Sequence, residues 1–212
     1  MDITFALRTF ITFFTVIDPL GLVPVTLVIL ANHSDKQRKQ IITRAIVISA
    51  LVITVFALLG KMLIQSLGIG LYAFNIAGGI LLFLISLEML FGRTPETRET
   101  DEEEKEAISK NDVSVFPLAI PMIAGPGTIA TTILFANSAS SNIVNIVVVI
   151  AAIIFCLLVA WFAMEKSSII MKLVSRTGIF VFSRILGILL AALAVQFILN
   201  GIQTYLKLNG LI

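Results

Sequence analysis

The chain consists of long apolar stretches separated by short charged segments. Each stretch reaches the roughly 20 residues that a helix needs to cross a hydrocarbon core about 30 Å thick. Because backbone groups inside a bilayer must hydrogen-bond within the protein, each stretch is expected to be an α-helix. The pattern predicts six transmembrane helices, at Ile3–Ala31, Ile41–Gly60, Leu71–Phe91, Val113–Ala136, Ile143–Met164 and Ile185–Tyr205.

The composition supports an all-α polytopic membrane protein. Of the 212 residues, 58% are hydrophobic and only 13% are charged, which is unlike a soluble domain. The net charge of +2 gives no reason to expect a nucleic-acid partner. The one cysteine, Cys156, lies inside an apolar stretch, so the sequence predicts no disulfide, metal site or cofactor. The lipid bilayer is the first expected partner.

The basic residues orient the predicted helices. Twelve of the 15 lysines and arginines fall in segments on one side: Lys36, Arg38, Lys39, Arg44, Arg93, Arg98, Lys105, Lys110, Lys166, Lys172, Arg176 and Arg184. The other side has Arg8, Lys61 and Lys207. Because cytoplasmic loops carry the excess of Lys and Arg, we expect a multi-pass protein of the cell (inner) membrane with basic cytoplasmic loops and both termini outside.

An internal repeat divides the chain into two halves. Residues 74–82 align with residues 182–190 at an offset of 108, and Asp18-Pro19 aligns with Gly125-Pro126 at an offset of 107. An odd number of spans per half inverts the second half. We expect a first three-span repeat at 1–92, a second, inverted repeat at 113–212, and a charged cytoplasmic linker at 93–112. The linker's acidic block is most simply a solvated connector, and a regulatory role stays open.

Helices 1 and 4 of the predicted set are expected to be broken. Prolines and glycines at Asp18–Pro24 and Pro117–Thr128 remove backbone hydrogen bonds from the middle of a span. Freed backbone groups in a membrane are tolerated where they line a cavity, and a helix starting at Pro126 would point its first amides at an anionic group there. The predicted substrate-binding residues are Asp18, Pro19, Gly21, Gly125, Pro126, Gly127 and Thr128.

Asp18 is the one acidic residue deep within a predicted span. Carboxylates in a membrane are costly and usually functional, so Asp18 is the candidate for ion coupling, by carrying a proton, or for pairing with a substrate ammonium. It also suits the N-cap of a helix beginning at Pro19. Four further polar residues are candidates either for lining the cavity or for hydrogen bonds between helices: Asn75, Thr131, Gln196 and Asn200.

Several segments together resemble the MarC family of integral membrane proteins. They are FTVIDPLGLVP at 14–24, AGGILLF at 77–83, PLAIPMIAGPGTIA at 117–130 and QFILNGI at 196–202. The resemblance covers essentially the whole chain apart from the acidic linker. It implies six spans and secondary transport of small neutral amino acids such as glycine and alanine.

The leading functional hypothesis is a secondary active transporter of small neutral amino acids, of the glycine, alanine and serine type, coupled to a H⁺ or Na⁺ gradient. A channel or passive facilitator, or an exporter of another small solute, stays open. An enzyme is not expected, because an aspartyl dyad needs two deep carboxylates and the chain offers Asp18 alone. The sequence leaves open the exact substrate, the coupling ion, the direction of transport and the presence of a homo-oligomer.

Overall fold

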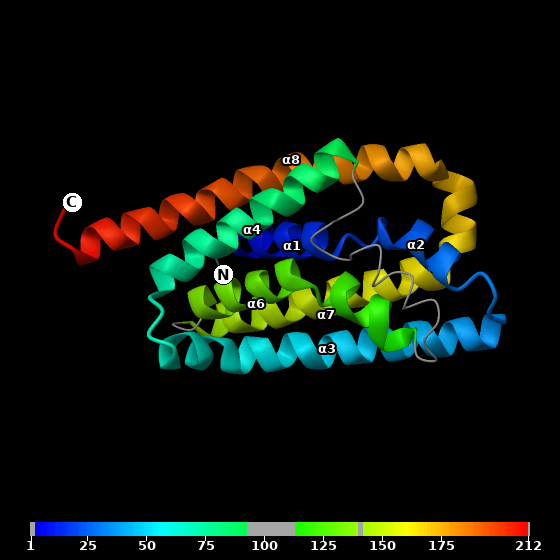
Figure 1. Ribbon diagram of the computed structural model, residues 1–212, viewed down its shortest axis with the longest axis horizontal. Helices are drawn as coiled ribbons and strands as arrows, with labels where there is room; N and C mark the ends of the chain where they lie inside the picture. Colours follow the sequence, from blue (N-terminus) through cyan, green and yellow to red (C-terminus); the bar gives the residue numbers. More distant parts are fainter. Residues whose placement is uncertain (1–2, 93–112, 140–141, 212) are drawn as a thin grey trace.

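The protein is a bundle of long helices (Figure 1). The computed structural model describes residues 3–92, 113–139 and 142–211, and these ranges contain helices and no strand. The expected all-helical class is therefore confirmed for them, while the predicted linker at 93–112 lies outside the described residues. The helices are α1 (Ile3–Ile17), α2 (Leu22–Ile29), α3 (Asp35–Ser66), α4 (Leu71–Phe91), η1 (Ser114–Ile123), α6 (Pro126–Ala139), α7 (Ile143–Glu165) and α8 (Ser167–Leu208).

Five segments in the described ranges are long and apolar enough to cross a membrane. They are Ile3–Ile29, which contains both α1 and α2, and the helices α3, α4, α7 and α8. A sixth is obtained if η1 and α6, which meet at an angle of 54°, form one bent span. The six predicted spans thus agree with the larger of the two counts.

The predicted helix boundaries agree with the structure for some spans and fall short for others. Leu71–Phe91 is reproduced as α4, but α3 runs from Asp35 to Ser66 instead of from Ile41 to Gly60. The extension begins with a capping box, in which Ser34 and Gln37 satisfy each other's backbone groups. Bilayer thickness predicts only the apolar part of a helix, so polar turns beyond it were missed.

The predicted loop between the fifth and sixth spans is wrong. Residues 167–184 are helical and form the first part of α8. The helix bends once, at Ser175, where φ is 60° and the side-chain oxygen accepts a hydrogen bond from the Gly178 N–H at 3.3 Å. In Figure 1 the turns before this bend lie across the end of the bundle and the remainder runs along it. Four basic residues had suggested a loop, yet the apolar residues between them pack as a helix.

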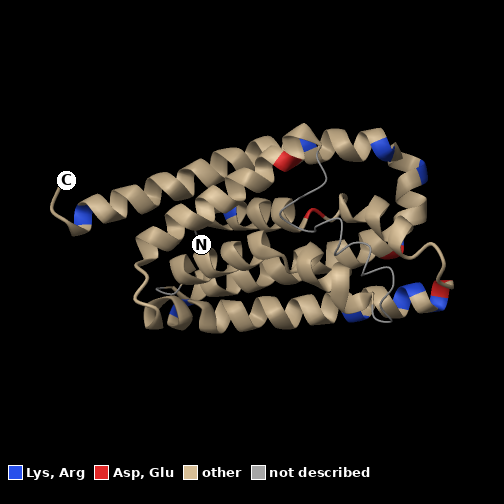
Figure 2. Ribbon diagram, viewed as in Figure 1, with Lys and Arg blue, Asp and Glu red and all other residues tan. Residues whose placement is uncertain are grey.

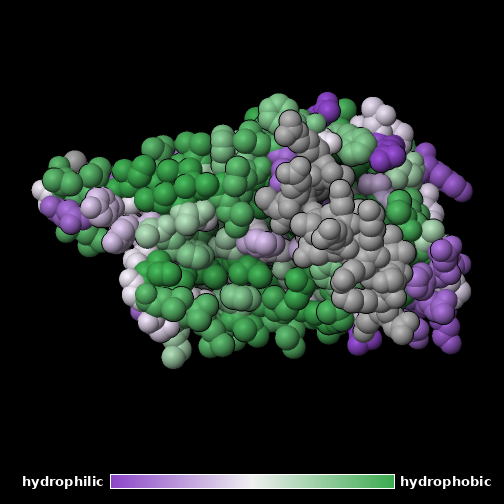
Figure 3. Space-filling view, viewed as in Figure 1, coloured by the Kyte–Doolittle hydropathy of each residue, from purple (hydrophilic) through white to green (hydrophobic). Residues whose placement is uncertain are grey.

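Helix packing buries a continuous apolar core and leaves an apolar exterior. α4 lies along α8, α1 packs on α7, and η1 packs on α3. Phe135 stands at the centre, with its ring against those of Phe5, Phe13 and Phe197. Large apolar side chains are also exposed along α3, α7 and α8, and Figure 3 shows them as a broad apolar face. A face of this kind suits contact with lipid chains.

Basic residues gather at one end of the bundle (Figure 2). We call this the basic end, and define it by the start of α3 (Asp35–Lys39) and the junction of α7 with α8 (Glu165–Ser168), which line a common cavity. The opposite end, where α3 finishes and the chain ends, shows fewer charged segments in Figure 2.

Candidate functional site

The first interruption of the helices separates α1 from α2 and contains Asp18. α1 ends at Ile17 and α2 begins at Leu22. Asp18 has a φ of 47°, in the left-handed region that Asp and Asn tolerate better than most residues. Its carboxylate Oδ1 accepts a hydrogen bond from the Gly21 N–H at 3.1 Å, and its carbonyl accepts one from the Leu22 N–H at 3.1 Å. Asp18 therefore stabilises a turn before α2. The predicted N-cap at Asp18 is wrong, because α2 begins at Leu22 and its N-cap is Gly21.

The Asp18 carboxylate is also held from a distant helix. The Ser183 hydroxyl of α8 donates to it, at 3.3 Å from Oδ2 and 3.5 Å from Oδ1. Only 7% of Asp18 is exposed. A Cβ added to Gly21 would collide with this carboxylate, so a side chain at that position would displace it. The buried charge thus sits between the start of α2 and the side of α8.

The second interruption separates η1 from α6. Phe116 and Ile120 depart from helical backbone angles inside η1. The Thr128 hydroxyl donates to the Ile123 carbonyl at 2.8 Å, which ties α6 back to the end of η1. In the first turn of α6 the amides of Gly127 and Thr128 have no acceptor within the helix, and the helix dipole places positive charge at this end. The arrangement favours an anionic group.

The end of α1 and the start of α6 meet around a small cavity. It is lined by Val16, Leu81, Ile85, Met122, Gly125, Pro126, Gly127 and Thr128, and its volume is about 10 Å³. A Cβ added to Gly127 would collide with Ile85 Cδ1 and approach Val16 Cγ1 to 3.3 Å. Since a water needs a cavity of about 10–15 Å³, this cavity has room for about one water in this conformation.

The structure brings together part of the predicted site. Gly125, Pro126, Gly127 and Thr128 line the cavity, whereas Asp18, Pro19 and Gly21 lie in the neighbouring turn, beginning two residues after Val16. Thr131 lies one turn further along α6 and is fully buried. Its hydroxyl has no hydrogen-bond partner among the described residues, and it is not among the residues that line the cavity.

Three of the predicted lining residues lie away from this cavity. Asn75 packs against Gly201, between α4 and α8. The side chain of Gln196 donates from Nε2 to Asn200 Oδ1 at 2.8 Å, along the exposed side of α8. The side chains of Gln196 and Asn200 thus satisfy each other at the surface of α8.

Sequence reasoning missed Ser183 and the apolar lining of the cavity. Ser183 had been placed in a loop because of its basic neighbours, although the internal repeat aligned it with Asn75. Val16, Leu81 and Ile85 carry no distinguishing signal, since most positions in these helices are apolar.

No group of three or more metal-ligating side chains occurs in the part of the chain that the structure describes.

Comparison with known proteins decides the family. The family model of MarC integral membrane proteins matches residues 3–206, which include both helix interruptions. The chain belongs to the MarC family. No solved structure matches it.

Relatives of this MarC protein occur in archaea and bacteria. It is 37% identical to a UPF0056 membrane protein of Methanocaldococcus jannaschii, over 95% of this chain and 89% of that protein. It is 32% identical to one of Aquifex aeolicus, over 94% and 93% of the two chains. It is 31% identical to the UPF0056 membrane protein YhcE of Escherichia coli K12, over 92% and 91%. These names describe membrane proteins and assign no substrate.

Proposed function

We propose that this MarC protein is a secondary active transporter of small neutral amino acids, of the glycine, alanine and serine type, coupled to a H⁺ or Na⁺ gradient. The observation that supports this most strongly is the meeting of two unlike helix interruptions in the bundle interior. One carries a buried carboxylate at Asp18, and at the other the first-turn amides of Gly127 and Thr128 lie beside the cavity. A zwitterionic amino acid has one charged group for each interruption, an ammonium for Asp18 and a carboxylate for the amides.

In the proposed bound state the substrate carboxylate lies at the start of α6 and its ammonium faces Asp18. The amides of Gly127 and Thr128 and the dipole of α6 stabilise the carboxylate. Asp18 is already bonded to Ser183 and Gly21, so an arriving ammonium or coupling ion competes for its oxygens. Val16, Leu81 and Ile85 leave space for a small apolar side chain once the cavity opens.

The proposed transporter consists of two inverted three-helix repeats, and the packing of α4 on α8 supports this. A Cβ added to Gly79 would approach the Ala194 carbonyl to 2.8 Å and also meet Ile198. The repeat offset of 108 is added to the α4 residue number and subtracted from the α8 residue numbers. The contact then becomes one of Gly187 with Ser86 and Leu90. A Cβ added to Gly187 would indeed approach the Ser86 carbonyl to 3.2 Å and also meet Leu90. Antiparallel helices related by a two-fold axis exchange contacts in this way.

Other helix pairs exchange in the same manner. α1 packs on α7 as η1 packs on α3, and α2 packs on α8 as α6 packs on α4. In each case the residue numbers of the second pair are those of the first pair shifted by half the chain length, up for one helix and down for the other. In transporters with inverted repeats, one half rocks against the other around a site at their interface, and both interruptions lie at this interface.

The proposed orientation places the basic end in the cytoplasm and both termini outside the cell membrane. Lys36, Arg38, Lys39 and Lys166 lie together at the basic end. Lys and Arg are enriched in cytoplasmic segments of membrane proteins, which supports this assignment.

Uptake by purified protein in liposomes tests the function. Labelled glycine, alanine and serine are offered under an imposed H⁺ or Na⁺ gradient, with Asp18→Asn beside the wild type. Asparagine tolerates the positive φ and keeps an acceptor for Gly21, so the variant removes the charge with little change in the turn. We expect saturable, gradient-driven uptake by the wild type and its loss in Asp18→Asn.

Each contrary result has a distinct meaning. Absence of saturable flux for all three amino acids would overturn the proposed substrate class. Flux that is the same with and without the imposed gradients would indicate a passive facilitator or channel. Gradient-driven uptake by Asp18→Asn would remove Asp18 from ion coupling, while leaving the substrate assignment intact.

A further inference from the structure

A second cavity lies at the basic end, away from both helix interruptions. Its volume is about 390 Å³, which is within the range of small-molecule sites. Its lining residues come from the start of α3 and from the α7–α8 junction: Asp35, Lys36, Arg38, Lys39, Ile42, Glu165, Lys166 and Ser168. Four of them are basic and two are acidic, so the lining has a net positive charge.

Part of this positive charge has no acidic partner in the described part of the chain. Lys166 Nζ pairs with Glu165 Oε1 at 3.4 Å, and Arg38 Nη2 donates to the Ser167 hydroxyl at 3.4 Å, which joins α3 to the start of α8. Lys36 and Lys39 are exposed and have no carboxylate partner among the described residues. Two ammonium groups and one guanidinium can therefore face an anionic group in the cavity.

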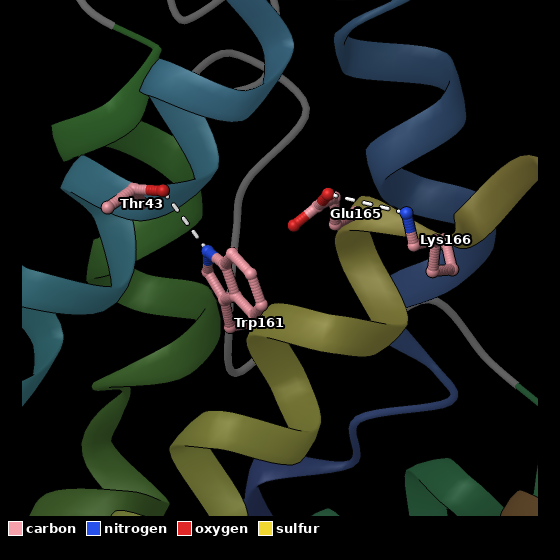
Figure 4. A network of polar contacts seen from close by, with 4 residues as sticks. All are labelled: Thr43, Trp161, Glu165 and Lys166. Carbon is pink, nitrogen blue, oxygen red and sulfur yellow. Dashed lines mark hydrogen bonds and ion pairs between the residues drawn. The ribbon is translucent and has the colours of Figure 1, made fainter.

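A tryptophan beside the cavity indicates its level in the membrane. Trp161 points from α7 toward α3, where its Nε1–H donates to the Thr43 hydroxyl at 3.1 Å (Figure 4). Lys39 Nζ lies 6.0 Å from the centre of the indole ring. Tryptophan is enriched at the boundary between headgroups and acyl chains. The cavity therefore lies at the level of lipid headgroups.

An apolar surface leads away from the cavity along the contact between α3 and α7. Val47 and Leu51 follow Thr43 at helical spacing on α3, and Leu158 and Ile154 precede Trp161 on α7. All four side chains are exposed. A ligand with a phosphate in the cavity can thus place hydrocarbon chains along this surface.

One polar atom of the cavity lining has no partner. Glu165 Oε2 is buried and accepts no hydrogen bond within the described residues, although Oε1 is bound to Lys166. A carboxylate oxygen is an acceptor only, so a donor on a ligand can satisfy it. The hydroxyls of a glycerol headgroup are such donors.

We propose that this cavity binds the phosphate of an anionic phospholipid with a glycerol headgroup. Lys36, Arg38 and Lys39 contact the phosphate, Glu165 accepts from the headgroup, and the acyl chains lie against α3 and α7. Basic residues that serve only to orient a membrane protein need no cavity, no neighbouring tryptophan and no adjoining apolar surface. The proposal does not depend on which solute the protein transports.

Trp161 allows a direct test, because it is the chain's single tryptophan. The purified protein is titrated in mixed micelles with phosphatidylglycerol or phosphatidylcholine, each brominated on its acyl chains, and quenching of Trp161 fluorescence is measured relative to the unquenched signal. We expect phosphatidylglycerol to quench at lower mole fraction. In Lys36→Gln/Lys39→Gln the preference falls by roughly fivefold for each charge removed.

A matched variant separates the cavity from general surface charge. Lys172→Gln/Arg176→Gln removes two basic residues from the same predicted side of the membrane but outside the cavity lining, and it is expected to keep the preference. Equal quenching by the two lipids, or an equal loss in both variants, would overturn the proposal. Displacement of the brominated lipid by millimolar glycerol phosphate would also overturn it, because a free phosphate ester would then be the ligand.

Discussion

Individual residues of the candidate site are constrained more by shape than by charge. Gly125 and Gly127 stand where a Cβ would collide with the Pro121 carbonyl and with Ile85. Likewise, Asp18 has a positive φ, and its carboxylate occupies the space that a Cβ at Gly21 would need. The prolines, glycines and carboxylate could be found from the sequence, because few other residues disrupt a span. Their neighbours Ser183 and Val16 could not, because the contacts bridge segments far apart in the chain.

Gly127→Ala is expected to lower amino-acid uptake about tenfold or more. The added methyl meets Ile85 Cδ1, the end of a side chain that can turn aside, but it also approaches Val16 Cγ1 to 3.3 Å and occupies the cavity at the start of α6. Overpacking of this kind costs about 1–3 kcal/mol. The measurement is initial uptake rate in liposomes at matched protein incorporation.

Gly178→Ala is the control for this substitution. Its Cβ would meet only neighbouring side chains of α8, Val174 Cγ1 at 3.1 Å and the Ser175 hydroxyl, and alanine favours the helix. Uptake by this variant should match the wild type. An unimpaired Gly127→Ala protein would show that the start of α6 does not limit access to the cavity.

At the scale of whole helices, the sequence predicted apolar spans better than helix ends. α4 was recovered because Gly92, with φ of 64°, ends it where the apolar stretch ends. The beginning of α8 was missed because charge was taken as evidence for a loop, although Lys172 and Arg176 lie on an exposed helix surface. A membrane helix that continues into water keeps its hydrogen bonds while losing its apolar signature.

Gly79→Val and Gly187→Val are expected to destabilise the protein by similar amounts, about 1–3 kcal/mol each. In both positions the added side chain meets a backbone carbonyl of the facing helix, that of Ala194 or that of Ser86, which cannot swing away as a side chain can. Thermal unfolding in detergent measures the effect. A loss confined to one of the two variants would argue against equivalent roles in the proposed repeat.

At the scale of the whole molecule, the proposed orientation can be tested with cysteine labelling. Cys156 is fully buried, so the wild type should not react with a membrane-impermeant maleimide. Lys61→Cys and Lys207→Cys should label in intact cells, whereas Lys36→Cys and Lys172→Cys should label only after the membrane is opened. The reverse pattern would place the basic end outside.

The cavity between α1 and α6 is too narrow in this conformation to hold a continuous file of water. Protons and ions cross membranes along continuous files of water, and a volume of about 10 Å³ holds at most about one such molecule. Val16, Ile85 and Gly127, which line this cavity, therefore leave no room for such a file at this point. The proposed transporter, if it keeps this width between cycles, would not drain the ion gradient that drives it.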